Sequence, residues 1–272
     1  MEKKKQGQSL YKAYEIFLPF IIYYVVYNIA FVLIVYACSA AAEFFDGGLR
    51  EYLMVHAGTL TELVGGLSML IAVLPLLPML RQELLLYNKE SVQLEKSGLR
   101  EKALTVLLIL ILAVSSSVGL NILLSLTGLV QASKAYQDVA SQQYSVVFGA
   151  GAVLFGLISP IAEEIVFRGL VFNRMRRYFS TIAAIIASGV LFGVYHGNLV
   201  QGIYGGCMGI LLAYLYERMR SFLMPCLFHA AANFTVFSLA QNAQVHARLF
   251  TLPGCIVLLT ISAACIIIIE KK

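Results

Sequence analysis

Charged residues are scarce in this sequence. Aspartate, glutamate, lysine and arginine make up 13% of its 272 residues, whereas a soluble domain carries about 25%. Low-complexity tails and internal repeats are absent, and the apolar runs leave little room for a separate soluble domain. Hydrophobic residues account for 60% of the chain, and the mean hydropathy is +0.81. The composition therefore predicts a protein that is integral to a membrane.

Cysteines with metal-ligand spacing are also missing. The chain has five cysteines, all within apolar runs and without a CxxC pair: Cys38, Cys207, Cys226, Cys255 and Cys265. We interpret them as small buried hydrophobic residues. No cleavable signal peptide is expected, because the first apolar run is long and lacks a small-residue cleavage site.

Long apolar runs make up most of the chain. A membrane-spanning helix needs about 20 mostly apolar residues, and the sequence offers eight such segments. They cover roughly 16–42, 58–80, 103–127, 143–160 with a helical continuation to about 178, 181–197, 200–217, 221–241 and 249–269. The predicted fold class is therefore an all-α polytopic membrane protein with about eight transmembrane helices.

The basic residues lie mainly on one side of these spans. Those on that side are Lys3, Lys4, Lys5, Lys12, Arg81, Lys89, Lys96, Arg100, Lys102, Arg174, Arg176, Arg177, Arg218, Arg220, Lys271 and Lys272. The other side holds Arg50, Lys134 and Arg248. Because lysine and arginine concentrate in cytoplasmic connections, both termini are predicted to be cytoplasmic. Residues beside anionic headgroups explain the net charge of +5, so no nucleic-acid partner is expected.

Three ionisable residues interrupt the fourth apolar segment, in S159-P-I-A-E-E-I-V-F-R-G169. A charge at the bilayer centre costs roughly 3 kcal/mol on insertion scales. Each of these three residues is therefore expected to have a charged partner or a functional role. Glu164 and Arg168 are separated by four residues, which places them on one helix face and predicts an ion pair. Glu163 is turned by about 100° from Glu164 and can face something else.

Two further spans carry polar side chains at similar depth. His196 ends the fifth span, one turn after Phe192, which could form a wall of a pocket beside it. His229 and Asn233 lie on one face of the seventh span because they are four residues apart. We expect the fourth, fifth and seventh spans to share one polar, water-containing cavity.

Two kinds of chemistry fit this set of residues. A glutamate in a low-dielectric site can deprotonate a water held by a histidine, while a second histidine and an amide stabilise an oxyanion. Together these would hydrolyse a peptide bond. The alternative is a zinc site with Glu163, His196 and His229 as ligands, although the HExxH metalloprotease signature is absent.

Three motifs resemble those of a known family. The segments E163-E-I-V-F-R168, F192-G-V-Y-H196 and H229-A-A-A-N233 match EExxxR, FxxxH and Hxxx(N/D), in this order and without a departure. These are the motifs of the CPBP family, the Abi-like CAAX proteases and bacteriocin-processing intramembrane peptidases. The resemblance covers roughly residues 145–240.

The resemblance implies a fold like that of the type II CAAX prenyl endopeptidases and an intramembrane protease activity. It implies that Glu163 acts as general base with His196 orienting the water. His229 and Asn233 would form the oxyanion hole.

Supporting roles follow from the same resemblance. Glu164 and Arg168 match the second acid and the arginine of the first motif and are assigned a structural pairing role, with Phe192 as a further supporting residue. The family has been described as metal-dependent. We favour catalysis without a metal cofactor and keep zinc, bound by the glutamate and the two histidines, as the second choice.

The chain divides into three parts on this interpretation. Residues 1–140 hold the first three spans and a cytoplasmic loop at 81–102, residues 141–242 form the CAAX-protease-like catalytic core, and residues 243–272 form a C-terminal transmembrane helix. The short loops and basic balance are similar to bacterial members, which predicts the bacterial plasma membrane. The expected partners are the bilayer and a peptide or membrane-associated protein substrate, entering from the cytoplasmic side or laterally.

Two alternative functions stay open. The chain could be a non-catalytic immunity or scaffold protein that regulates a membrane partner such as a sensor kinase or transporter. A small transporter with a proton-relay carboxylate is a third reading, weakened by the absence of inverted repeats.

Overall fold

The structure is a computed structural model that describes residues 2–43, 47–88 and 98–271, and the regular elements in these ranges are all helical. In chain order they are α1 (Glu2–Glu43), α2 (Gly47–Val55), α3 (Ala57–Val73), the 3₁₀ turn η1 (Leu74–Leu76), α4 (Leu77–Asn88), α5 (Leu99–Leu126), α6 (Leu129–Ala132), α7 (Lys134–Tyr144), α8 (Phe148–Val153), the π-helical η3 (Leu154–Ile158), α9 (Ser159–Glu164), the π-helical η4 (Ile165–Phe172), α10 (Asn173–Met175), α11 (Thr181–Tyr195), α12 (Leu199–Met219), α13 (Leu223–Ala240), α14 (Ala243–Leu249) and α15 (Leu252–Lys271). The predicted all-α class is confirmed.

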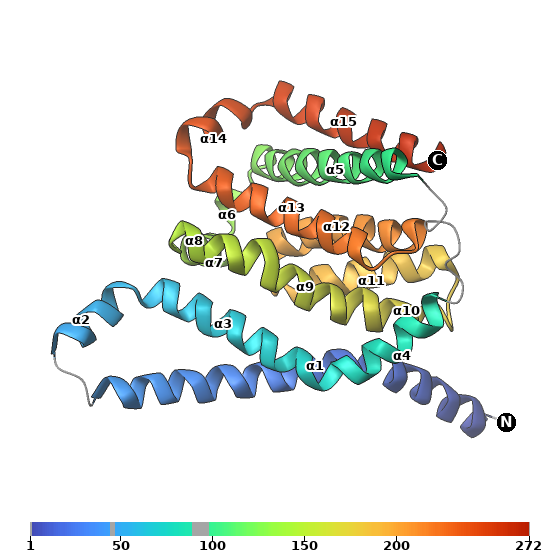
Figure 1. The fold of residues 1–272 in the computed structure, drawn as a ribbon, viewed down its shortest axis with the longest axis horizontal. Helices are drawn as coiled ribbons and strands as arrows, with labels where there is room; N and C mark the ends of the chain where they lie inside the picture. The colour runs from blue at the N-terminus through green and yellow to red at the C-terminus, as the bar shows by residue number, and fades with distance from the viewer. Residues whose placement is uncertain (1, 44–46, 89–97, 272) are drawn as a thin grey trace.

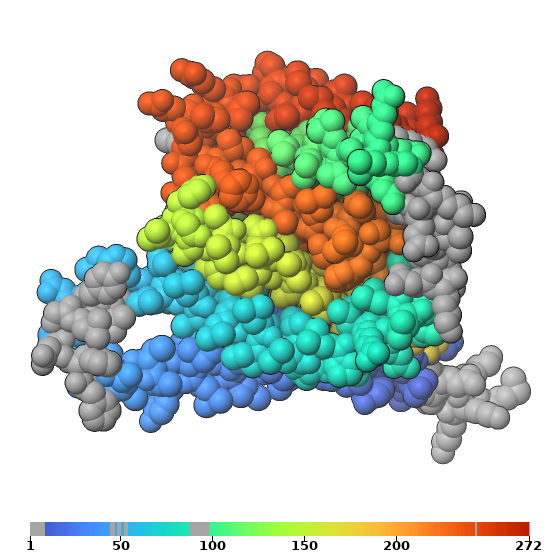
Figure 2. All heavy atoms as spheres, in the orientation of Figure 1, coloured from blue at the N-terminus to red at the C-terminus, as the bar shows by residue number. Residues whose placement is uncertain are grey.

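The long helices form a bundle with a central group and two flanks (Figure 1). On one flank α5 packs against α15, and on the other α1 packs against α3. Between them, α11 packs against α12, and α13 contacts both α5 and the helix that runs from α8 to α10. Figure 2 shows that side chains close the spaces between the ribbons of α5, α13 and α9 on the visible face.

Seven helices of the described chain are long and apolar enough to cross a membrane. The fifth predicted span, 181–197, corresponds to α11, a shorter apolar helix of 15 residues. At about 1.5 Å per residue it is roughly 22 Å long, less than the hydrocarbon thickness of about 30 Å. The protein is an integral membrane protein. The sidedness of its termini and the division at residues 140 and 242 stay predictions.

Several element bounds differ from the sequence prediction. The first helix starts at Glu2 instead of near residue 16, and the second apolar run continues through η1 at Pro75 into α4. Short helices α2, α6, α7 and α14 occupy connections between the predicted spans. A search for membrane-spanning apolar runs does not find such helices, because each is much shorter than a span. Much of the predicted loop 81–102 lies outside the described residues.

The fourth span is one helix with two π-helical segments. The whole helix runs Phe148–Met175, and α9, which carries both glutamates, lies between η3 and η4. Pro160 stands in the first turn of α9, directly after η3. A proline lacks the N–H that an α-helix interior requires, and π-helical turns commonly occur at such interruptions and at functional sites.

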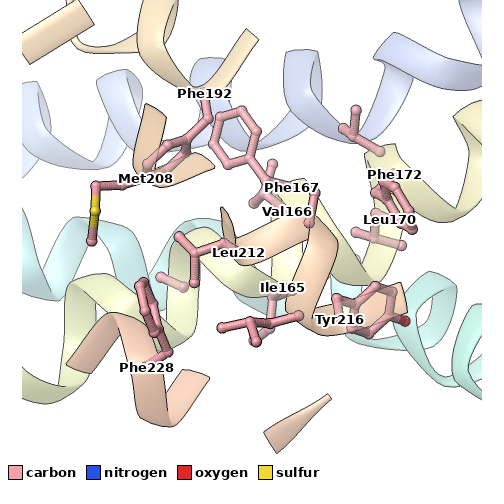
Figure 3. Packing of buried hydrophobic residues seen from close by; sticks show 14 of the residues in the cluster. Ile165, Val166, Phe167, Leu170, Phe172, Phe192, Met208, Leu212, Tyr216 and Phe228 are labelled. Atoms are coloured by element: carbon pink, nitrogen blue, oxygen red, sulfur yellow. The ribbon is translucent and has the colours of Figure 1, made fainter. Parts of the chain in front are cut away.

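Large apolar side chains form the core around this helix. Phe167, Phe172 and Phe228 are fully buried, together with Tyr216 from α12. Figure 3 shows them packed with Phe192 and their neighbours from several helices. The fourth span is therefore held by aromatic contacts on several sides.

Charged residues concentrate at one end of the bundle. Arg174 pairs with Glu83 at 3.1 Å, and Arg177 contacts Glu15 and Glu83 at 2.5 Å. These contacts join α10 to α1 and α4. We call this end, defined by Glu15, Glu83, Arg174 and Arg177, the ion-pair end. The beginning of α1 and the end of α15 lie at the same side of the molecule in Figure 1, as an even number of crossings requires.

Glycines bring α11 and α12 into backbone contact. A Cβ atom on Gly193 would lie 2.3 Å from the carbonyl oxygen of Gly202 and 2.8 Å from the backbone nitrogen of Gly206. On Gly189 it would lie 2.6 Å from the backbone nitrogen of Ile210. Small residues permit this close approach, so these glycines allow the two helices to pack backbone to backbone.

Replacing Gly193 by alanine should destabilise the protein. The new methyl group meets backbone atoms that cannot rotate away, so overpacking should cost about 1–3 kcal/mol. This exceeds the gain in helix propensity, which is about 1 kcal/mol. Thermal unfolding in detergent measures the change. Gly149→Ala is the matched control, because a Cβ there meets nothing within 4 Å. Equal midpoints for the two variants would contradict the close packing.

Candidate active site

A fully buried ion pair lies behind the candidate site. Arg168 Nη1 donates to Glu164 Oε1 at 3.0 Å, and both side chains have 0% exposure. Arg168 Nη2 donates to the carbonyl oxygen of Gly209 on α12 at 2.9 Å. The guanidinium lies over the ring of Phe192, 4.7 Å from its centroid. The pair predicted from the four-residue spacing is present, and it also links the fourth span to α11 and α12.

Glu164 has a second partner that sequence spacing did not reveal. His229 Nδ1 lies 2.8 Å from Glu164 Oε1. An ionised carboxylate only accepts hydrogen bonds, so Nδ1 carries the proton and is the hydrogen-bond donor. The opposite ring nitrogen, Nε2, lies 3.6 Å from Glu163 Oε2. The histidine therefore lies between the two adjacent glutamates, oriented by one and facing the other.

Glu163 is buried and has a fixed orientation. Its side chain lies on α9, one residue before Glu164, and the hydroxyl of Ser159 donates to Oε1 at 2.8 Å. This bond leaves Oε2 as the oxygen that faces His229. Ser159 was not among the predicted site residues, although its four-residue spacing from Glu163 in an α-helix was a usable signal.

His196 is held by the end of its own helix. It follows α11 as the C-cap, and the next residue, Gly197, has a left-handed φ of 75° that ends the helix. The Nδ1 atom lies 2.8 Å from the carbonyl oxygen of Phe192. A carbonyl only accepts, so Nδ1 donates and the lone pair of the neutral ring is on Nε2. A Cβ on Gly205 would lie 3.2 Å from this ring, so glycine leaves room for it.

One cavity joins the predicted catalytic residues. It has a volume of about 420 Å³, and its lining includes Glu163, His196, His229 and Asn233, with Phe192 as part of the wall. The cavity that we expected between the fourth, fifth and seventh spans is thus present.

The cavity extends beyond the three predicted spans. Tyr27 of α1, Glu62 of α3 and Asn121 of α5 also line it, together with residues of α7. Residues 1–140 offered no chemical signal in the sequence, yet they form part of the wall. Tyr195 of α11 and Tyr204 of α12 line it as well.

The zinc alternative has limited support from the geometry. In the described ranges, no three histidine, cysteine, aspartate or glutamate side chains come close enough together to hold a metal ion. His229 donates through Nδ1 to Glu164, as metal-bound histidines also do, and its Nε2 faces Glu163 across 3.6 Å. Catalysis without a metal therefore stays a prediction, with zinc bound by Glu163, His196 and His229 as the second choice.

Comparison with known proteins agrees with the fold and the motifs. Residues 145–235 match the family described as type II CAAX prenyl endopeptidase Rce1-like. All three motifs lie within this matched region, so the match supports the resemblance that the motifs indicate.

One curated relative also has the name of a membrane peptidase. The chain is 27% identical over 136 residues to a protein of Bacillus subtilis named "Putative membrane peptidase YdiL". The match covers 43% of this chain and 55% of the relative, so the chain spans about half the length of that protein. No solved structure matches the chain.

Neutralising Glu164 should cost far more stability than neutralising an exposed glutamate. Glu164→Gln leaves the buried charge of Arg168 without its counter-ion, and breaking a buried pair in this way costs about 3–5 kcal/mol. Glu270→Gln is the matched control. Glu270 is 55% exposed in its pair with Arg218, and exposed pairs contribute about 0–1 kcal/mol. Thermal unfolding of both variants in detergent makes the comparison. Similar small losses would show that the Arg168 charge does not depend on Glu164.

Proposed function

We propose that the protein is an intramembrane endopeptidase in which Glu163 activates water. The observation that carries this proposal is the shared cavity, where a buried carboxylate, two imidazoles and an amide meet. The family description and the name of the relative, a type II CAAX prenyl endopeptidase and a membrane peptidase, support it. The substrate would be a peptide bond in a peptide or membrane-associated protein.

Hydrogen-bond directions define where the attacking water would bind. Glu163 Oε1 accepts from Ser159, so Oε2 is the oxygen available to take a proton from water. His196 donates through Nδ1 to a backbone carbonyl, so its Nε2 accepts from the other hydrogen of the same water. A water held by these two acceptors has its lone pairs directed at the substrate. We assign Glu163 as general base and His196 as the residue that orients the water.

Asn233 and His229 would stabilise the oxyanion formed when water adds to the carbonyl. The side-chain amide of Asn233 can donate without any change in protonation. His229 already donates through Nδ1 to Glu164, so it can donate through Nε2 when the ring carries a second proton. Removing one such donor typically lowers kcat by about 10²–10³-fold. Glu163 then gives the proton it took from water to the leaving amine, which completes the hydrolysis.

The site would operate in a membrane. We propose the bacterial plasma membrane with both termini in the cytoplasm, because the ion-pair end contains the residues that the positive-inside rule places there.

Glu163→Gln should abolish cleavage while the protein still folds. The amide cannot accept the proton of water, and general-base catalysis contributes about 10²–10⁴-fold. Cleavage of a quenched fluorescent peptide library by purified protein in detergent is the measurement. Glu43→Gln, an exposed position at the end of α1, is the control and should behave as wild type. Unchanged cleavage by Glu163→Gln would refute the assignment, and full cellular function of this variant would favour a non-catalytic scaffold.

Catalysis should not require a bound metal. We expect the purified protein to contain less than stoichiometric zinc and to retain full cleavage after treatment with a chelator. Metal analysis of the same sample used for the cleavage assay tests this. Stoichiometric zinc whose removal abolishes cleavage, and whose return restores it, would overturn the metal-free mechanism.

A further inference from the structure

A second carboxylate lies in the cavity that contains Glu163. Glu62, in the second turn of α3, is half-buried and lines the cavity. Gln142 of α7 donates from Nε2 to Glu62 Oε1 at 2.9 Å. This is a hydrogen bond to a neutral partner, so the charge of Glu62 is not compensated by it. The proposed mechanism does not use this residue.

The cavity has no positive charge to balance these two acids. Its described lining contains Glu62 and Glu163 but no lysine or arginine. No described lysine or arginine side chain forms an ion pair with Glu62. Opposite charges attract more strongly where water is partly excluded. A cationic group would therefore be favoured in this part of the cavity.

Aromatic rings reinforce the preference for a cation. Tyr27, Tyr136 and Tyr144 line the same cavity, and the bond between Gln142 and Glu62 brings the α7 segment that carries Tyr136 and Tyr144 next to Glu62. The faces of aromatic rings attract lysine and arginine side chains. Carboxylate and tyrosines together make a suitable pocket for a basic side chain.

The distance between Glu62 and Glu163 can be estimated from positions along their helices. Gly66 of α3 packs against the fourth span: a Cβ atom on Gly66 would lie 2.3 Å from Leu154 and 3.9 Å from Ile158. The two helices run in the same direction (Figure 1). A helix rises about 1.5 Å per residue, so Glu62 lies about 6 Å from the Gly66 contact toward one end of the bundle, and Glu163 lies about 10 Å from it toward the other end. An extended peptide advances about 3.3 Å per residue. Allowing for the length of a lysine side chain, the distance corresponds to roughly three to five residues.

We propose that Glu62 is a specificity-determining residue that binds a lysine or arginine of the substrate, on the α7 side of the scissile bond. This rests on the proposed function, in which the cavity receives a peptide. The α7 side lies opposite the ion-pair end. The substrate would therefore reach the site from the end opposite the predicted cytoplasmic face, which differs from the cytoplasmic or lateral entry that we expected from the sequence.

The test uses a fluorescent, quencher-paired peptide library in which one position at a time is lysine or norleucine. These side chains have similar length and differ in charge. Wild-type protein should prefer lysine at one position on one side of the cleaved bond. Glu62→Gln should lose about tenfold in kcat/KM for the lysine peptide, the size expected for one charged hydrogen bond, and little for the norleucine peptide. Glu62→Lys should invert the preference toward glutamate at that position.

Asp138→Asn provides the matched control. Asp138 is an exposed acid on α7 at the same end of the bundle and outside the cavity lining, so its removal should leave the lysine preference unchanged. Equilibrium binding of the same labelled peptides to each variant is measured in parallel, because binding does not depend on turnover.

The two readouts separate the failure of this inference from failure of the proposed function. Cleavage without any lysine preference, or with the same preference in Glu62→Gln, would overturn the role of Glu62 and leave the peptidase intact. Binding that depends on lysine and on Glu62, without cleavage, would support the basic subsite and overturn the peptidase. Neither cleavage nor binding would overturn both.

Discussion

The buried charge of Arg168 constrains the centre of this molecule. A guanidinium with no exposure must be compensated where it lies, and the compensation comes from Glu164 on its own helix, the Gly209 carbonyl of α12 and the face of Phe192 on α11. Because these partners belong to different helices, the charge fixes their mutual positions. Glu164 also orients His229 of α13, so one carboxylate joins the structural pair to the candidate catalytic set.

The adjacent glutamates have different tasks because a helix turns them apart. Glu164 faces the arginine and has no exposure, whereas Glu163 faces the cavity and is oriented by Ser159. The π-helical η3 directly precedes Pro160, whose missing N–H interrupts the helix, and η4 follows the two glutamates. The buried structural carboxylate and the candidate catalytic one can thus be neighbours, each with a different hydrogen-bond donor.

The two ends of the bundle are chemically different. One end contains the ion pairs of Arg174 and Arg177 with Glu15 of α1 and Glu83 of α4. The cavity extends from the candidate catalytic residues toward α7 and Glu62 at the other end. Backbone contact between the glycines of α11 and α12 keeps the intervening helices close. Such close contact leaves the cavity, not the helix interfaces, as the space for a substrate.

The sequence by itself determined the membrane class, most of the spans, the Glu164–Arg168 pair and the convergence of Glu163, His196, His229 and Asn233 on a common depth. Hydropathy and four-residue spacing act within a single helix, so they can be read from the chain. Tertiary structure alone decided that Glu164 orients His229, that polar short helices such as α7 cover the cavity, and that Glu62 lies in its wall. These contacts join residues far apart in sequence, and their distances depend on how the helices pack, which no local spacing specifies.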